Sequence, residues 1–527
     1  MPIPFQKMHP HEDGIKRSLA MRKKTKRRYM LIILLIIALA STSFLVSPLT
    51  QPNESIPHEK HAADPQISGQ TDDASRLNKA KVSEIWEIPV DHENPEAQIA
   101  ELLKRARKDG LKVSIAGARH TMGGHTIYPG GIVINTTPWN HMELNTRHDI
   151  LKVQAGALWE DVVPYLNTHG KSVSVMQSNN SFSVGGSISV NCHGWQYDRP
   201  PIASSVESFR IILADGSIKH CCREQNQELF SLALGGYGLF GIILDVELRV
   251  VPNELYRLEQ YIVPVNKSLG TFDHQIKNQP GLEMVYARMN IVPDDLLDEV
   301  ILNAFYRIPQ PEGSNRGVSD KLLEPSLIEL RRAVFRGSAE SHFGKKLRWN
   351  AETKLQPSLK SKTISRNQLL NESVEVFENR TTDTTDILHE YFVPRHKAAS
   401  FVDAMRRILE RHEPNLLNVT VRSVNRDDDT FLRYADRQMI AFVMLYVQEK
   451  THEGEDEMRA LTRDLINASL RHKGRYYLPY RLHATHKQFH RAYPQATQFF
   501  ALKRKYDPEQ LFQNQFYLKY GPLDELK

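Results

Sequence analysis

The chain has 527 residues, enough for about three domains. Its 40% apolar and 25% charged residues, with 27 Gly and 28 Pro, indicate a globular protein and exclude collagen, coiled-coil and disordered classes. The formal charge of +6 arises in residues 1–28, which hold nine Lys and Arg against two Asp and Glu, so the composition indicates no nucleic-acid partner.

The N-terminal region is predicted to hold a membrane segment. Residues 29–46 form an uncharged apolar run of 18 residues, close to the ~20 needed to cross a bilayer. The basic tail, residues 1–28, ends in a Lys/Arg block that is expected to stay cytoplasmic. These features predict a single-pass membrane protein with its catalytic part on the outer side. A cleavable signal peptide, or a twin-arginine signal at Arg27-Arg28, remains an alternative to the favoured anchor.

A flexible linker and then a folded domain are expected next. Residues 47–80 are polar, rich in proline and free of aromatic residues, as in unstructured linkers. In the domain predicted over 81–252, Asn94, Pro95 and Gly110 delimit an amphipathic helix. A strand at 111–116 then leads into a glycine-rich turn, whose backbone N–H groups suit a pyrophosphate.

The rest of this domain repeats the pattern of strand, helix and glycine cluster. A strand at 150–154 and a helix at 158–167 precede a second cluster at 183–194, where small residues let a large group approach the backbone. Asp215-Gly216 predicts a hairpin turn. A helix at 226–234, a third glycine cluster and a strand at 242–250 follow.

Four motifs in this domain resemble, in order and spacing, the PCMH-type FAD-binding domain of the vanillyl-alcohol oxidase superfamily. They are Gly117-Ala118-Arg119-His120-Thr121, the block from Val184-Gly185-Gly186 to Cys192-His193-Gly194, Leu213-Ala214-Asp215-Gly216-Ser217, and Gly236-Tyr237-Gly238-Leu239-Phe240-Gly241-Ile242. The resemblance implies an α+β protein with a two-subdomain FAD-binding domain. An antiparallel-sheet substrate (cap) domain would span 253–470, and residues 471–527 would return to the FAD domain.

The resemblance also implies which residues bind FAD. They are Ala116, Gly117, Ala118, Arg119, His120, Thr121, Gly185, Gly186, Ser187, Asn191, His193, Gly238, Gly241 and Ile243. His120 would be bonded covalently to the flavin 8α-methyl, the alternative being a histidine that only hydrogen-bonds a phosphate. Asn179 stands where doubly linked relatives have a cysteine, so no second bond is expected. His193 is expected to pack against the cofactor, and His125 to be a neutral residue behind the site or at the surface.

The cap and the C-terminal return are expected to supply the catalytic side chains. Strands at 387–394, 417–424 and 438–447 would lie over the flavin ring, and residues 506–516 are similar to the ending of alditol and aldonolactone oxidases. Arg422 matches the arginine of the Glu-x-Arg pair in those enzymes, although Thr420 replaces the glutamate. The catalytic candidates are Arg422, Tyr480, His483 and Lys487. Glu390 is expected to stabilise the cap.

The expected function is a membrane-tethered FAD-dependent oxidoreductase. It would oxidise a CH–OH group of a sugar, polyol, lactone or related alcohol and pass electrons to oxygen or a respiratory acceptor. Alternatives are an oxidase of a lipid-linked sugar resembling the prenyl-phosphoryl-ribose oxidases, a sterol reductase-like enzyme and a non-catalytic flavin-binding module. Residues 316–366 carry a local charge of +7, which indicates a solvated surface or contact with anionic lipid. The three cysteines are expected to be free thiols, and no metal site is expected.

Overall fold

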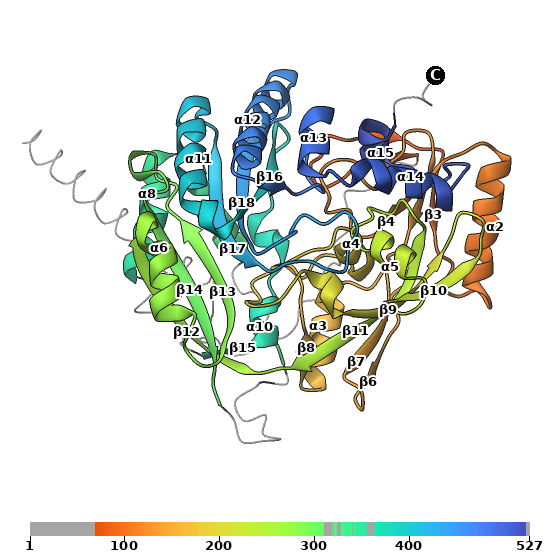
Figure 1. Ribbon diagram of the computed structural model, residues 1–527, viewed down its shortest axis with the longest axis horizontal. Coiled ribbons are helices and arrows are strands. Elements are labelled where there is room, and N and C mark those ends of the chain that lie inside the picture. The colour runs from red at the N-terminus through yellow and green to blue at the C-terminus, as the bar shows by residue number, and fades with distance from the viewer. Residues whose placement is uncertain are drawn as a thin grey trace, which may run out of the picture.

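The computed structural model describes residues 69–309, 319, 321–323, 328–339, 341–355 and 363–522. Figure 1 shows a cap half, with helices α11 and α12, beside a second half that carries α2 and α3. None of the helices within the described ranges has the length and apolar character needed to cross a bilayer. The anchor predicted at 29–46 lies outside these ranges, as do the basic tail and most of the linker.

The half that carries α2 and α3 is the FAD-type half, and it contains two sheets. The first of them is parallel and has three strands in the order β3-β5-β4. Its elements are β3 (Glu84–Glu87), α2 (Pro95–Lys108), β4 (Val113–Ala116) and β5 (Ile132–Asn135). The side chain of Asn94 accepts a hydrogen bond from Ala97 N, and Gly110 follows the helix with φ +68°. The predicted helix and its end signals are therefore confirmed.

The second sheet of this half is antiparallel, in the order β10-β9-β11-β7-β6, with β8 also paired to β11. Its strands are β6 (Met142–Asn145), β7 (Ile150–Gln154), β8 (Lys171–Val173), β9 (Val206–Ile212), β10 (Ile218–Cys222) and β11 (Ile242–Pro252). The accompanying helices are α3 (Trp159–Thr168), α4 (Val184–Ser189) and α5 (Gln227–Ala233). The Asp-Gly hairpin is confirmed, because Ile212 pairs with Ile218 and the Asp215 carboxylate accepts from Ser217 N.

The cap is built on an eight-stranded antiparallel sheet in the order β15-β12-β14-β13-β17-β18-β16-β19. Its strands are β12 (Leu255–Pro264), β13 (Leu282–Met289), β14 (Glu299–Arg307), β15 (Thr363–Ser365), β16 (Thr384–Pro394), β17 (Leu416–Val424), β18 (Met439–Glu449) and β19 (Arg475–Tyr476). Helices α11 (Ala398–His412) and α12 (His452–Arg471) pack their apolar stripes against β16 and β18 (Figure 1). The three predicted cap strands are confirmed as β16, β17 and β18.

The C-terminal segment runs back to the FAD-type half, as the sequence predicts. It contains α13 (His486–Ala492), α14 (Ala496–Tyr506) and α15 (Gln515–Tyr520), which lie near α4 and β4 in Figure 1. Phe512 forms a parallel bridge with Val113 of β4. The buried Asp507 carboxylate fixes this return, since it accepts from Leu511 N and Phe512 N and pairs with buried Lys503.

Within its described residues, the basic segment at 316–366 is only partly at the surface, so the predicted surface roles do not hold for its buried arginines. Arg331, Arg332, Arg348 and Arg366 are each at most 6% exposed. Arg331 pairs with Glu372 at 2.5 Å, and Arg348 pairs with Glu352 at 3.0 Å. Several of the cations thus help to hold the cap together, because they pair with Glu352 within the segment and with Glu372 just beyond it. All three cysteines are free thiols, as predicted.

Candidate active site

A cavity of about 2140 Å³ lies between the two halves and is lined by both. Ordinary small-molecule pockets measure about 300–1,000 Å³. The cavity is therefore large enough for a dinucleotide together with a substrate. Its walls come from the glycine clusters of the FAD-type half and from one face of the cap sheet.

The first two glycine clusters form one wall and are tied by a single hydroxyl group. Ser183 Oγ accepts from both Ala118 N and Gly186 N, each at 3.3 Å. A Cβ added to Gly117 would lie 2.1 Å from the same oxygen, so only glycine allows this approach. The sequence motifs at 117–121 and 183–186 thus meet in space although α3 and four strands separate them along the chain.

The third glycine cluster completes this wall of the cavity, and the three clusters together are named the glycine cradle. Gly238 and Gly241 have φ of +71° and +150°, conformations that side chains disfavour. A Cβ on Gly241 would lie 2.5 Å from Ile212 O. Both glycines line the cavity with Ile243, so three of the predicted FAD-binding residues stand together on this part of the wall.

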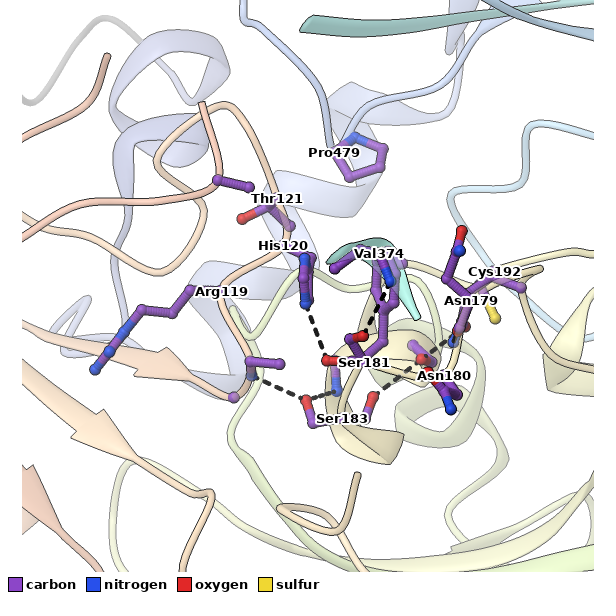
Figure 2. A pocket seen from close by; sticks show the side chains of 18 of the residues that line it. Arg119, His120, Thr121, Asn179, Asn180, Ser181, Ser183, Cys192, Val374 and Pro479 are labelled. Carbon is purple, nitrogen blue, oxygen red and sulfur yellow. Dashed lines mark hydrogen bonds between the residues drawn. The ribbon is translucent and has the colours of Figure 1, made fainter. Parts of the chain in front are cut away.

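His120 occupies the junction of the cradle and the cap (Figure 2). Its Nε2 lies 2.9 Å from Ser181 O, and its ring stacks on Phe182 with centroids 4.2 Å apart. A carbonyl oxygen only accepts hydrogen bonds, so Nε2 carries the proton and Nδ1 the lone pair. Arg119, which has φ +56°, points away from His120.

The cavity wall fits a polar ligand such as FAD. Within the described ranges, the buried polar atoms on the cavity wall that have no hydrogen-bond partner include Thr121 Oγ1, Asn180 Oδ1, His193 Nδ1 and Arg422 Nε. Leaving buried donors and acceptors unpaired costs about 1–3 kcal/mol each, so a ligand that satisfies them is favoured. Thr121, His193 and the glycines of the tied clusters are among the residues that the resemblance assigns to FAD binding.

A buried carboxylate and imidazole meet where the cap faces the cradle. His193 Nε2 lies 2.6 Å from Glu390 Oε1, and the two residues are only 5% and 3% exposed. The sequence favours a stabilising role for Glu390, but β16 turns its carboxylate into the cavity. His193 comes from the second glycine cluster, so this hydrogen bond joins the two halves at the site.

Tyr480 and Arg422 stand beside this pair, as expected of catalytic candidates. Burial, and then the Glu390 charge, raise the pKa of Tyr480 well above its usual value. Arg422 Nη1 donates to His193 O and Nη2 donates to Ser178 Oγ, each at 3.1 Å. Both residues line the cavity. The hydroxyl group of Tyr480 therefore stays protonated, while the guanidinium group of Arg422 supplies a positive charge.

Two of the predicted catalytic residues lie elsewhere, which corrects their assignment. His483 is buried, with its Nε2 3.0 Å from Glu455 Oε1 and its Nδ1 3.0 Å from Thr462 Oγ1. It is absent from the cavity lining. Lys487 is exposed in the first turn of α13 and does not line the cavity either. The loose match of this stretch to the related oxidases therefore misplaced both residues, since His483 lies just before α13 and Lys487 within it, outside the cavity lining.

Three of the predicted FAD-binding residues make hydrogen bonds to other parts of the protein. Asn191 donates to Asp427 at 2.9 Å and accepts from Ala203 N, and it is not part of the cavity lining. Ala116 ends β4, where its carbonyl accepts from Thr136 N, and also stays outside the lining. Ser187 reaches the cavity, but its hydroxyl group is engaged by Trp159 and Gln177.

Comparisons with known families agree with this division into two halves. The FAD binding domain family matches residues 94–222. The D-arabinono-1,4-lactone oxidase family matches residues 246–520, which is more than half of the chain. The chain belongs to the D-arabinono-1,4-lactone oxidase family. The family match covers the cap strands, Glu390, Arg422, Tyr480 and the C-terminal return.

Individual relatives of this family member match over shorter stretches. L-gulonolactone oxidase from Bos taurus is 26% identical over 183 residues, 34% of this chain and 41% of the relative. Cytokinin dehydrogenase 2 from Arabidopsis thaliana is 33% identical over 150 residues, 28% and 30% of the two chains. Decaprenylphosphoryl-beta-D-ribose oxidase from Mycolicibacterium smegmatis is 25% identical over 186 residues, 35% and 40% of the two chains. The aligned regions span less than half of these relatives' lengths.

Proposed function

We propose that this protein is an FAD-dependent oxidoreductase that oxidises a CH–OH group of a sugar, polyol, lactone or related alcohol. The observation that carries the proposal is the buried Glu390–His193 pair at the junction of the glycine cradle and the cap sheet. When bound, FAD supplies the acceptor for the hydrogen on the carbinol carbon. The names of the relatives, which include sugar-lactone and ribose oxidases, support this substrate class.

In this proposal a side chain of the protein accepts the proton that leaves the substrate hydroxyl group. Glu390 Oε accepts that proton, and its hydrogen bond to His193 Nε2 holds the carboxylate toward the cavity. Tyr480, kept protonated, donates a hydrogen bond to the substrate oxygen. Arg422 holds its positive charge near the reacting end of the cavity, where reduction of a flavin would build negative charge.

His120 is proposed to attach FAD covalently. The Ser181 carbonyl holds the Nε2 proton, so the lone pair for a bond to the flavin methyl group lies on Nδ1. Stacking on Phe182 fixes the ring orientation. The purified protein and a His120→Ala variant are compared on a denaturing gel under acid, with flavin fluorescence as the readout. Fluorescence that stays with the wild-type band alone supports the bond, and fluorescence lost from both bands refutes it.

The activity itself is tested by adding polyols, aldonolactones and lipid-linked sugars to the FAD-loaded protein without oxygen. Loss of the oxidised flavin absorbance with at least one of them supports the proposal. Hydrogen peroxide on admission of oxygen then identifies an oxidase, whereas reoxidation only by a quinone or dye identifies a dehydrogenase. A flavin that stays oxidised with the whole panel would favour a non-catalytic flavin-binding module.

We also propose that the protein is membrane-tethered through residues 29–46, with its N-terminus cytoplasmic and its catalytic part outside. The apolar run and the preceding basic block support this orientation. Membranes are washed with alkaline carbonate, and intact cells are treated with protease. Retention after the wash, with digestion of the catalytic part from outside, is expected. Release by the wash would exclude the anchor.

A further inference from the structure

We propose that the cap sheet carries a second subsite for a neutral sugar unit, so that the preferred substrate is a disaccharide derivative or glycosylated polyol. The subsite is formed by Gln260, Asn303, Tyr286, Trp195 and Asn418, all of which line the cavity. This inference rests on the proposed function, because it assigns the substrate class of the same site. It concerns the part of the cap wall that extends from β17 to β12, beyond the strands next to Glu390.

The strand register extends the cavity wall well beyond the proton-accepting pair. Glu390 on β16 pairs with Val443 on β18, which pairs with Thr420 on β17. Thr420 pairs in turn with Arg288 on β13. Directly paired residues point to the same face of a sheet. This row therefore presents one continuous wall, and each of its members lines the cavity.

The wall continues over two more strands. Tyr286 on β13 pairs with Asn303 on β14, and Asn303 pairs with Gln260 on β12. Neighbouring strands lie about 4.8 Å apart, so five spacings from β16 to β12 correspond to about 24 Å along the sheet. A single sugar ring bridges roughly two neighbouring strands on this scale. The lined wall is therefore longer than a monosaccharide requires.

The side chains on this distant part of the wall suit hydroxyl groups. Gln260 Nε2 donates to Asn303 Oδ1 at 2.6 Å, and Asn418 Nδ2 donates to Thr420 Oγ1 at 2.9 Å. Each amide group has further donor and acceptor positions, which match the alternating donors and acceptors of a polyol. The amide–amide bond also holds Gln260 and Asn303 in fixed orientations before a ligand arrives.

An aromatic surface lies between the amides and the reacting end. The rings of Trp195 and Tyr286 are stacked, with centroids 4.5 Å apart and an interplanar angle of 23°. Both rings line the cavity, and Trp195 Nε1 is buried with no partner in the described part of the chain. An apolar ring face with an available N–H donor fits the amphipathic surface of a sugar ring.

The charges next to the subsite favour a neutral ligand. Arg288 Nη1 lies 3.1 Å from Glu352 Oε1, and both residues line the cavity. Glu352 also pairs with Arg348 at 3.0 Å. Since Arg288 and Glu352, the oppositely charged groups that line the cavity here, pair with each other, the wall recognises hydroxyl groups chiefly through amides and aromatic rings. The chemistry on this part of the wall is that of a neutral glycosyl unit.

The test compares substrates that differ by one glycosyl unit on the full-length, FAD-loaded protein. The pairs are sorbitol with maltitol, sorbitol with lactitol, and gluconolactone with cellobionolactone. In at least one pair, the longer compound is expected to have a kcat/KM for flavin reduction about ten-fold higher, as one or two added hydrogen bonds would give. Equal or lower values for the longer member of every pair would overturn the inference.

A Gln260→Trp variant fills the distant end of the wall and separates this inference from the proposed function. It should lower kcat/KM for the longer substrate about ten-fold and leave the shorter one within about two-fold. Gln275→Trp, at an exposed glutamine that does not line the cavity, is the matched control and should change neither. A Gln260→Trp variant that slows both substrates alike would contradict the subsite.

A binding measurement decides the inference even if no compound reduces the flavin. The thermal midpoint of the FAD-loaded protein is recorded with maltitol and with sorbitol. A larger increase with maltitol that disappears in Gln260→Trp supports the subsite. This holds even where no compound reduces the flavin and the proposed oxidation has therefore failed. Equal increases in the wild type and the variant refute the subsite and leave the proposed oxidation unaffected.

Discussion

The two walls of the cavity are built in different ways. The glycine cradle comes from three short motifs, and each motif supplies contiguous residues to the wall, such as 117–121. The cap wall takes between one and four residues from each of six strands, from Gln260 on β12 to Glu390 on β16. Backbone shape dominates the cradle, whereas side-chain chemistry dominates the cap wall. Substitutions should therefore affect cofactor retention on the first wall and turnover on the second.

Among the substitutions that test this difference between the two walls, Glu390→Gln is expected to have the largest effect. The variant keeps the size of the side chain but cannot accept a proton, so flavin reduction by substrate should slow about 10²- to 10⁴-fold. The flavin content should stay at the wild-type level. Stopped-flow absorbance measures the rate, with Glu378→Gln, another glutamate on the cavity wall, as control. An unchanged rate in Glu390→Gln would remove this carboxylate from the reaction.

A smaller loss of turnover is expected from Arg422→Lys. A lysine keeps the charge but cannot donate at once to His193 O and Ser178 Oγ. Losing one charged hydrogen bond costs about 1.5–3 kcal/mol, so kcat/KM should fall about 10- to 100-fold. Arg426→Lys, at an exposed arginine just beyond β17, provides the control. Wild-type kinetics in Arg422→Lys would show that charge alone is sufficient at this position.

On the cradle wall, Gly117→Ala should reduce FAD binding. The added Cβ would lie 2.1 Å from Ser183 Oγ and break the tie between the first two glycine clusters. Overpacking of this kind costs about 1–3 kcal/mol. The flavin content after purification is the measurement. Gly270→Ala, where an added Cβ meets no atom within 4 Å, should retain the wild-type content, and full loading of Gly117→Ala would contradict the cradle.

The smallest expected effect is on the stability of the fold in acid. It comes from His483, which lines neither wall. Burial lowers the pKa of His483 to about 4, while the unfolded imidazole titrates near 6.5. The unfolded state therefore binds more protons as the pH falls from 6.5 to 4, and folding loses about 2 kcal/mol between pH 7 and pH 5 from this residue.

Chemical denaturation at these two pH values tests this expectation. His483→Gln should show a smaller loss of unfolding free energy on acidification than the wild type does. His274→Gln, at an exposed histidine, should behave as the wild type. An equal pH dependence in all three proteins would show that His483 does not stay neutral in the fold.

The sequence determined the elements and the cradle of this protein. Asn94, Pro95 and Gly110 delimit α2 as predicted, and the Asp-Gly pair forms the β9–β10 hairpin. Such signals act within a few residues, so a single sequence contains them in full. The glycine clusters are likewise visible in the sequence as short local motifs, although their contacts with one another form only in the fold.

Only the tertiary structure decided which cap residues face the cavity. Glu390 and His193 are 197 positions apart, and their contact forms only where β16 of the cap meets the second glycine cluster at the cavity. His483 and Lys487, predicted from a loose local match, lie behind the site instead. A strand's period of two residues shows that its side chains alternate between faces, but the register across neighbouring strands decides which of them meet.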